Sequence, residues 1–188
     1  ADVVLYYCHH CNIKGGVFMR TVGDNMPDYR LQACLKDNTL GEVYTADDTF
    51  GNWSVFYFYP KDFTFICPTE IKEMDRLVDE GLNVIGISGD NEYCKKAWKE
   101  SNPMIKDIRH PLAADSGLHL SGELNIIAVE GVCLRATVIT DERNIIQHIS
   151  VNALDTGRNV DEIINTVNAL KSGGLTACNW KPGDGFVG

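Results

Sequence analysis

The chain has little positive charge and no long apolar run. Its 17 lysines and arginines are outnumbered by 26 aspartates and glutamates, which leaves a formal net charge of -9 in 188 residues. Such an acidic balance argues against a surface that binds nucleic acid. No run of about 18 apolar residues offers a membrane span, and the sequence contains no internal repeat. We therefore expect one cytoplasmic globular domain that has neither nucleic acid nor a membrane as its partner.

The seven cysteines lack the regular spacing of a secreted disulfide framework. Because their number is odd, some thiols must stay free or pair between chains. The segment from Cys8 to Cys11 reads Cys-His-His-Cys, but a structural zinc site usually needs a second pair of ligands, and none lies nearby. We expect residues 1–19 to be an N-terminal extension without a dedicated role, with a metal or redox function as the alternative. We expect no cofactor.

One cysteine lies where a strand is expected to pass into a helix. Residues 54–59, Ser-Val-Phe-Tyr-Phe-Tyr, are mostly β-branched or aromatic and predict a buried strand. Apolar residues then recur at helical spacing over residues 71–78, and Pro68 suits the first helical position. Cys67 should therefore lie at the N-terminus of this helix, where unpaired N–H groups and the helix dipole favour an anion such as a thiolate.

Apolar strand-like segments alternate with amphipathic helical segments through the rest of the chain. This order predicts an α/β fold with a mixed central sheet flanked by helices. The expected strands lie at 83–88, 111–113, 135–140 and 145–150, and the expected helices at 92–100, 118–124 and 160–170. The polar residues between the last two strands suit a β-hairpin. After Lys171 the pattern becomes glycine-rich and polar, so residues 172–188 are expected to form a C-terminal arm.

Pro60, Thr64 and Cys67 fit the pattern Pro-x-x-x-Thr-x-x-Cys, which resembles the peroxidatic signature of the peroxiredoxins. The similarity is to the alkyl hydroperoxide reductase C type of typical two-cysteine peroxiredoxin, and it covers roughly Thr21 to Asp184. It is carried by the segments 58–71, 83–88, 97–98, 134–139 and 157–162. The resemblance implies a thioredoxin-like fold over residues 20–171. It also implies a thiol-dependent peroxidase of antioxidant defence, active as a homodimer that assembles into a larger ring.

Reduction of a peroxide requires a charged nucleophile and stabilisation of the leaving oxygen. Cys67 is expected to attack the peroxide and become a sulfenic acid, with the Thr64 hydroxyl beside the sulfur. The resemblance places Arg135 next to the thiolate, where a permanent positive charge steadies developing negative charge. Pro60 would shield the pocket, and Glu70 would orient the guanidinium. The alternatives are an inert buried thiol, a surface ion pair at Arg135 and a Thr64 that only ends a turn.

The resolving cysteine departs from the family pattern. That pattern places it four residues before a tryptophan, a position that Thr176 occupies here, whereas Cys178 lies two residues before Trp180. Cys178 is nevertheless the expected resolver, because thiol–disulfide exchange demands access and this cysteine lies in a loop-like arm. The family geometry implies that the resolver comes from the partner subunit, which makes the disulfide intermolecular. Cys34, Cys94 and a one-cysteine cycle with an external thiol remain alternatives.

Three functions compete for these residues. A peroxidase would reduce hydrogen peroxide and organic hydroperoxides, and a thioredoxin-like or dedicated disulfide reductase would recycle it. A general thiol–disulfide oxidoreductase is disfavoured, because residues 67–70 lack the second cysteine of a Cys-x-x-Cys pair. A holdase or redox relay would not need Cys67, and this activity can coexist with a peroxidase. The sequence favours the peroxidase.

Overall fold

The computed structural model describes residues 19–188, and the predictions for Cys8, Cys11 and the rest of residues 1–18 lie outside this range. In chain order the elements are β1 (Arg30–Cys34), β2 (Leu40–Tyr44), β3 (Ser54–Phe58), α1 (Cys67–Met74), β4 (Asn83–Ser88), α2 (Glu92–Ser101), β5 (Leu112–Ala114), α3 (His119–Glu123), β6 (Arg135–Thr140), β7 (Ile146–Asn152) and α4 (Val160–Lys171). A 3₁₀ turn, Asp75–Val78, continues α1. Within the described residues, no helix has the length and apolar character needed to cross a membrane.

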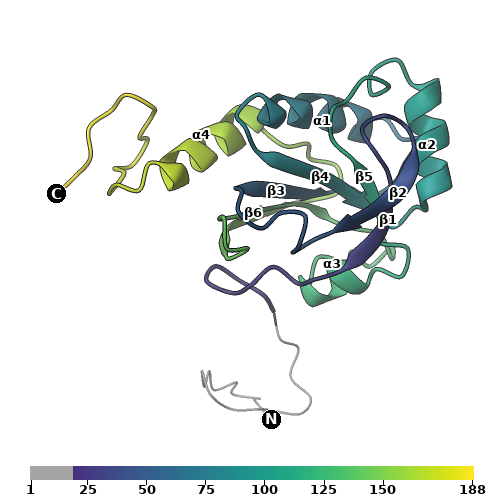
Figure 1. Ribbon diagram of the computed structural model, residues 1–188, viewed down its shortest axis with the longest axis horizontal. Helices are drawn as coiled ribbons and strands as arrows, with labels where there is room; N and C mark the ends of the chain where they lie inside the picture. The colour runs from purple at the N-terminus through teal and green to yellow at the C-terminus, as the bar shows by residue number, and fades with distance from the viewer. Residues whose placement is uncertain (1–18) are drawn as a thin grey trace, which may run out of the picture.

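The strands form one mixed sheet of seven, in the order β2-β1-β5-β4-β3-β6-β7. β4 pairs in parallel with β3 and with β5, and the remaining pairs are antiparallel. β6 and β7 form the hairpin that the polar residues between them predicted. The predicted α/β fold with a mixed sheet and flanking helices is therefore confirmed (Figure 1).

The two faces of the sheet carry separate cores. β3 is buried along its whole length, and its side chains alternate between the faces. Val55 and Tyr57 belong to the core that includes residues of α1, α2 and α4, whereas Phe56 and Phe58 belong to the core on the side of α3. Figure 1 shows α1 above the sheet and α3 below it. The chain that leaves β3 therefore leads into the buried core that lies between the sheet and α1.

No strand was predicted at β1 or β2. β1 is only five residues long and partly exposed, and β2 is an edge strand whose one buried residue is Val43. Both depend on pairing with neighbouring strands more than on their own apolar pattern. Elsewhere the boundaries move by one or two residues, and α1 begins at Cys67, one residue before Pro68. Pro68 suits this second position too, because the N–H that it lacks has no partner in the first helical turn.

The last segment, residues 172–188, contains no helix or strand. In Figure 1 it extends from the far end of α4, away from the sheet. Trp180 is buried, stacks on Phe186 with ring centroids 6.1 Å apart, and accepts a hydrogen bond of 2.9 Å at its carbonyl from the Asn165 side chain. Cys178 is exposed. The aromatic stack thus folds the arm on itself, and the Asn165 hydrogen bond joins it to α4 while the Cys178 thiol stays at the surface.

Candidate active site

Cys67 is the first residue of α1 and follows the loop that leaves β3. Its exposed fraction is only 1%, and it belongs to the core beneath α1. Ile66, the N-cap residue, provides no side-chain hydrogen bond to the helix. Cys67 therefore lies at a helix N-terminus that has no side-chain cap from Ile66, and the positive end of the helix dipole there favours an anion.

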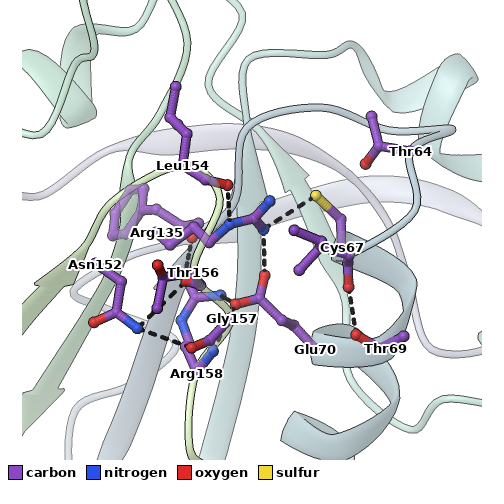
Figure 2. A network of polar contacts seen from close by, with 12 residues as sticks. Thr64, Cys67, Thr69, Glu70, Arg135, Asn152, Leu154, Thr156, Gly157 and Arg158 are labelled. Atoms are coloured by element: carbon purple, nitrogen blue, oxygen red, sulfur yellow. Dashed lines mark hydrogen bonds and ion pairs between the residues drawn. The ribbon is translucent and has the colours of Figure 1, made fainter.

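Arg135 opens β6, and the pairing of β6 with β3 brings it beside Cys67. Its Nη1 lies 3.4 Å from Cys67 Sγ and 2.6 Å from Glu70 Oε2, and its Nε donates to the carbonyl of Leu154 at 2.7 Å. Figure 2 shows the guanidinium between the sulfur and the carboxylate. Burial alone lowers the pKa of Arg135, but the hydrogen bond to Cys67 and the charge of Glu70 raise it above its ordinary value. Arg135 is therefore a fixed positive charge next to the thiol.

A second buried arginine, Arg158, contacts the other oxygen of Glu70. Its Nη1 lies 2.9 Å from Glu70 Oε1, and the same oxygen accepts a hydrogen bond of 3.1 Å from the Arg158 backbone N–H. Its side chain also donates to the hydroxyl of Thr137 at 3.0 Å and to the carbonyls of Ala136, at 2.9 Å, and Phe58. Glu70 thus bridges two guanidinium groups. Sequence reasoning did not single out Arg158, although it lies in a segment that matched the family pattern.

Thr64 and Pro60 lie in the loop before Cys67, and both are half-buried. The Thr64 hydroxyl donates a hydrogen bond of 2.9 Å to the carbonyl of Lys61. In the part of the chain that the structure describes, no hydrogen bond joins Thr64 to Cys67, and Figure 2 draws no interaction between them. In the structure the Thr64 hydroxyl is therefore engaged in a turn of the loop.

The described residues include five free cysteines. Cys34 and Cys133 are buried and Cys94 is partly exposed, whereas Cys178 is exposed. Burial raises the pKa of Cys94 and of Cys133 to about 11, and burial also raises the pKa of Cys34. Among these five thiols, only that of Cys67 has an arginine within hydrogen-bond distance.

A buried thiol at a helix N-terminus, in contact with an arginine and carried by a mixed α/β sheet, defines a thiol-based redox enzyme. The four residues that begin at Cys67 contain no second cysteine. The site therefore does not offer the neighbouring thiol of a dithiol exchange enzyme.

Comparison with known proteins agrees with this class. Residues 22–149 match the AhpC/TSA family. The alkyl hydroperoxide reductase C of Mycolicibacterium smegmatis is 38% identical over 178 aligned residues, which cover 87% of this chain and 91% of that protein. The chloroplastic 2-cysteine peroxiredoxin of Chattonella marina is 36% identical over 86% of this chain and 89% of that protein.

Solved structures extend the similarity to the whole fold. The reduced 2-Cys peroxiredoxin of Plasmodium vivax has a TM-score of 0.82 and 34% identity, over 88% of this chain and 91% of its own. AhpC of Mycobacterium tuberculosis has a TM-score of 0.78 and 34% identity, over 87% of this chain and 99% of its own. The chain therefore belongs to the AhpC/TSA family: it is a peroxiredoxin, a thiol-dependent peroxidase with the thioredoxin-like fold that the resemblance implied.

Proposed function

We propose that Cys67 is the peroxidatic cysteine and that it reduces hydrogen peroxide and organic hydroperoxides. Its thiolate attacks one peroxide oxygen, an S–O bond forms as the O–O bond breaks, and the leaving hydroxide or alkoxide takes up a proton. The cysteine becomes a sulfenic acid, and the peroxide becomes water or an alcohol. The observation that carries this proposal is the 3.4 Å distance between Arg135 Nη1 and Cys67 Sγ at the N-terminus of α1.

The surrounding residues have separate tasks in this proposal. Arg135 stabilises the thiolate and the negative charge that develops on the leaving oxygen. Glu70 fixes the Arg135 guanidinium, and Arg158 in turn fixes Glu70. Pro60 shields the pocket from solvent. Thr64 rotates its hydroxyl from the loop carbonyl, which it contacts in the structure, toward the bound peroxide.

We assign the resolving role to Cys178 of the partner subunit in a homodimer. Its thiol condenses with the Cys67 sulfenic acid, a disulfide forms, and water leaves. The exposure of this position supports the assignment, whereas burial raises the pKa of Cys34 and raises that of Cys94 to about 11, which makes both poorer thiolates. A thioredoxin-like or dedicated reductase then supplies two electrons and restores both thiols.

The proposed assembly and location follow from this cycle. A disulfide between subunits makes a homodimer the smallest active unit, and we propose that such dimers assemble into a larger ring. The cycle also needs a reducing environment, for which we propose the cytoplasm. The five free thiols among residues 19–188 are compatible with such an environment.

Oxidation with one equivalent of hydrogen peroxide tests the proposal. Wild type, Cys67→Ser and Cys178→Ser are compared by intact mass and on non-reducing gels, with Cys94→Ser as the matched control. We expect a dimer-sized band in wild type and in Cys94→Ser that both other variants lack. Cys178→Ser should instead accumulate a sulfenic acid at Cys67.

Other outcomes would change particular assignments. If dimers persist in Cys178→Ser but not in Cys67→Ser, another cysteine resolves the sulfenic acid and the peroxidase proposal stands. If Cys67→Ser consumes peroxide like the wild type, the assignment of the nucleophile is wrong.

A further inference from the structure

A buried ion pair ties the loop before Cys67 to α2. Asp62 lies in this active-site loop, residues 60–66, and Lys95 lies in α2. Lys95 Nζ is 3.4 Å from Asp62 Oδ1, and neither side chain is exposed to solvent. Burial of a charge removes it from water at a large cost in free energy unless a partner compensates it. Each of these two charges therefore depends on the other.

Hydrogen bonds complete this anchor. The Tyr59 hydroxyl donates to Asp62 Oδ1 at 2.8 Å, and the Asp62 backbone N–H donates to Asp90 Oδ2 at 2.7 Å. Lys95 Nζ donates to the Tyr59 hydroxyl at 3.2 Å and to the hydroxyl of Ser88. Burial raises the pKa of Asp62 and lowers that of Lys95, as expected for charged groups that have left water.

The residue after Asp62 adopts a backbone conformation that needs support. Phe63 has a φ of 56°, in the left-handed region that residues other than glycine seldom adopt. Its ring packs on Trp98 of α2, with the ring centroids 5.9 Å apart. Lys95 and Trp98 are three positions apart, so they lie on the same face of α2. One helix face thus holds two successive residues of the loop.

The closed loop also confines the nucleophile. Cys67 is 1% exposed, so a second thiol can reach its sulfur only when the loop opens. Opening of residues 60–66 would move Asp62, which lies in this loop, away from Lys95 in α2. We propose that Lys95 is a positioning residue whose ammonium anchors Asp62, holds Cys67 in place for reaction with peroxide, and sets how readily the loop opens for disulfide formation. This inference rests on the proposed function of Cys67, but it concerns a residue that does not touch the reacting atoms.

The charges of Asp62 and Lys95 are buried when the loop is closed, as in the structure, and would reach water when the loop opens. Loss of one partner leaves the other charge buried without compensation, which penalises the closed loop far more than loss of both. Lys95→Met should therefore favour the open loop, and Asp62→Asn combined with Lys95→Met should restore the closed one. Lys96→Met is the matched control, because Lys96 contacts Glu100 and the carbonyl of Asn38.

Hydrogen exchange of the reduced protein tests the anchor without any peroxide. We expect the amides of residues 61–67 to exchange at least about tenfold faster in Lys95→Met than in wild type, because an uncompensated charge promotes local opening. Lys96→Met should match the wild type, the double variant should regain protection, and exchange in β6 and β7 should stay unchanged. If Lys95→Met does not fold, Asp62→Asn takes its place and should open the loop in the same direction.

Stopped-flow oxidation distinguishes positioning from general stability. Lys95→Met should react with hydrogen peroxide about tenfold more slowly, because the thiol spends less time in the reactive geometry. It should then condense to the disulfide faster than the wild type. General loss of folded protein would slow both steps, so opposite changes identify a positioning role.

Two results would overturn the inference. One is equal exchange of the loop in Lys95→Met and wild type, and the other is faster exchange spread evenly over all elements. If the wild type does not consume peroxide, the proposed function fails, whereas the exchange comparison still decides whether Lys95 anchors the loop.

Discussion

Cys67 and Cys133 are both buried thiols, one in each core of the sheet. Cys67 lies in the core beneath α1, and Cys133 lies in the core on the side of α3. The Cys67 sulfur is 3.4 Å from Arg135 Nη1, whereas the Cys133 sulfur is 3.2 Å from the hydroxyl of Ser121. Burial raises the pKa of Cys133 to about 11, although the hydrogen bond with Ser121 opposes the shift.

This difference separates burial from reactivity. A buried thiol is ordinarily an inert apolar side chain, because a thiolate far from water and from any cation is costly. A guanidinium beside the sulfur supplies a countercharge and also a group that stabilises the leaving oxygen. The neighbours of a buried cysteine therefore decide what it does, more than its exposed fraction does.

Separate replacement of Cys67 and of Cys133 should give the largest difference in peroxidase activity between the two cores. We expect Cys67→Ser to lower the rate of peroxide consumption by more than about 10³-fold, since an alcohol is a much weaker nucleophile than a thiolate. Cys133→Ser should stay within about threefold of the wild type and lose about 1 kcal/mol of stability. Direct measurement of residual peroxide checks both. Equal loss of activity in the two variants would contradict a single reactive core.

Alkylation compares the same two thiols without substitution. At pH 8, a thiol with a pKa of about 11 is ionised in only about one molecule in 10³. Because the thiolate is the reactive form, labelling of Cys133 should rise about tenfold per pH unit between pH 8 and pH 10. Peptide mass mapping at pH 8 should find Cys67 labelled by iodoacetamide and Cys133 unlabelled until urea unfolds the protein. Prompt labelling of native Cys133 at pH 8 would contradict the expected difference in reactivity between Cys67 and Cys133.

Removal of the Arg135 guanidinium should make the Cys67 thiol less reactive, and so more like the Cys133 thiol in the opposite core. Arg135→Met is expected to slow the reaction of Cys67 with hydrogen peroxide about 100-fold, the usual cost of losing one preorganised charge-stabilising group. Arg143→Met is the matched control, because the Arg143 side chain is 76% exposed and its ion pair with Asp141 lies away from the sulfur. Stopped-flow kinetics measure both. A similar small decrease in the peroxide rate in both variants would contradict the proposed role of Arg135.

Neutralisation of the bridging carboxylate of Glu70 should have a smaller effect on rate than loss of Arg135, and a clear effect on stability. Glu70→Gln leaves two buried guanidinium groups without their shared anion, which should cost about 3 kcal/mol and lower Tm by about 6–12 °C. The peroxide rate should fall less than about tenfold, because Arg135 remains. Glu73→Gln, at an exposed ion pair with Arg76, should change stability by less than about 1 kcal/mol. An unchanged Tm in Glu70→Gln would mean that the bridge does not stabilise the site.

The junction between β3 and α1 could be predicted because its signals are local. The signals are a run of β-branched and aromatic residues, a proline at the start of a helix, and apolar residues at helical spacing. All three come from residues that are close together in the sequence. The contact of Arg135 with Cys67 spans 68 residues, and only the family resemblance indicated it. The two short strands Arg30–Cys34 and Leu40–Tyr44 were missed, since their stability comes mainly from pairing.

Arg158 and Lys95 are buried cations that escaped prediction for a related reason. Arginine and lysine are rarely buried unless paired, so a sequence read alone places them at the surface. Arg158 is buried because Glu70 and the strand ends surround it, and Lys95 because Asp62 faces it. These partners come into contact only after the sheet has formed, and no local sequence pattern predicts the contacts.

The bridge of two arginines and one glutamate also determines how the site responds to its own chemistry. Together with a Cys67 thiolate, the buried charges of Arg135, Arg158 and Glu70 sum to zero. Conversion of the thiolate to a neutral sulfenic acid leaves one positive charge uncompensated where water is scarce. If Cys67 is oxidised as proposed, we expect the pocket to loosen at the step in which the sulfur must leave it. A sulfinate would restore the missing negative charge, so we expect further oxidation of the same sulfur to stabilise the closed pocket again.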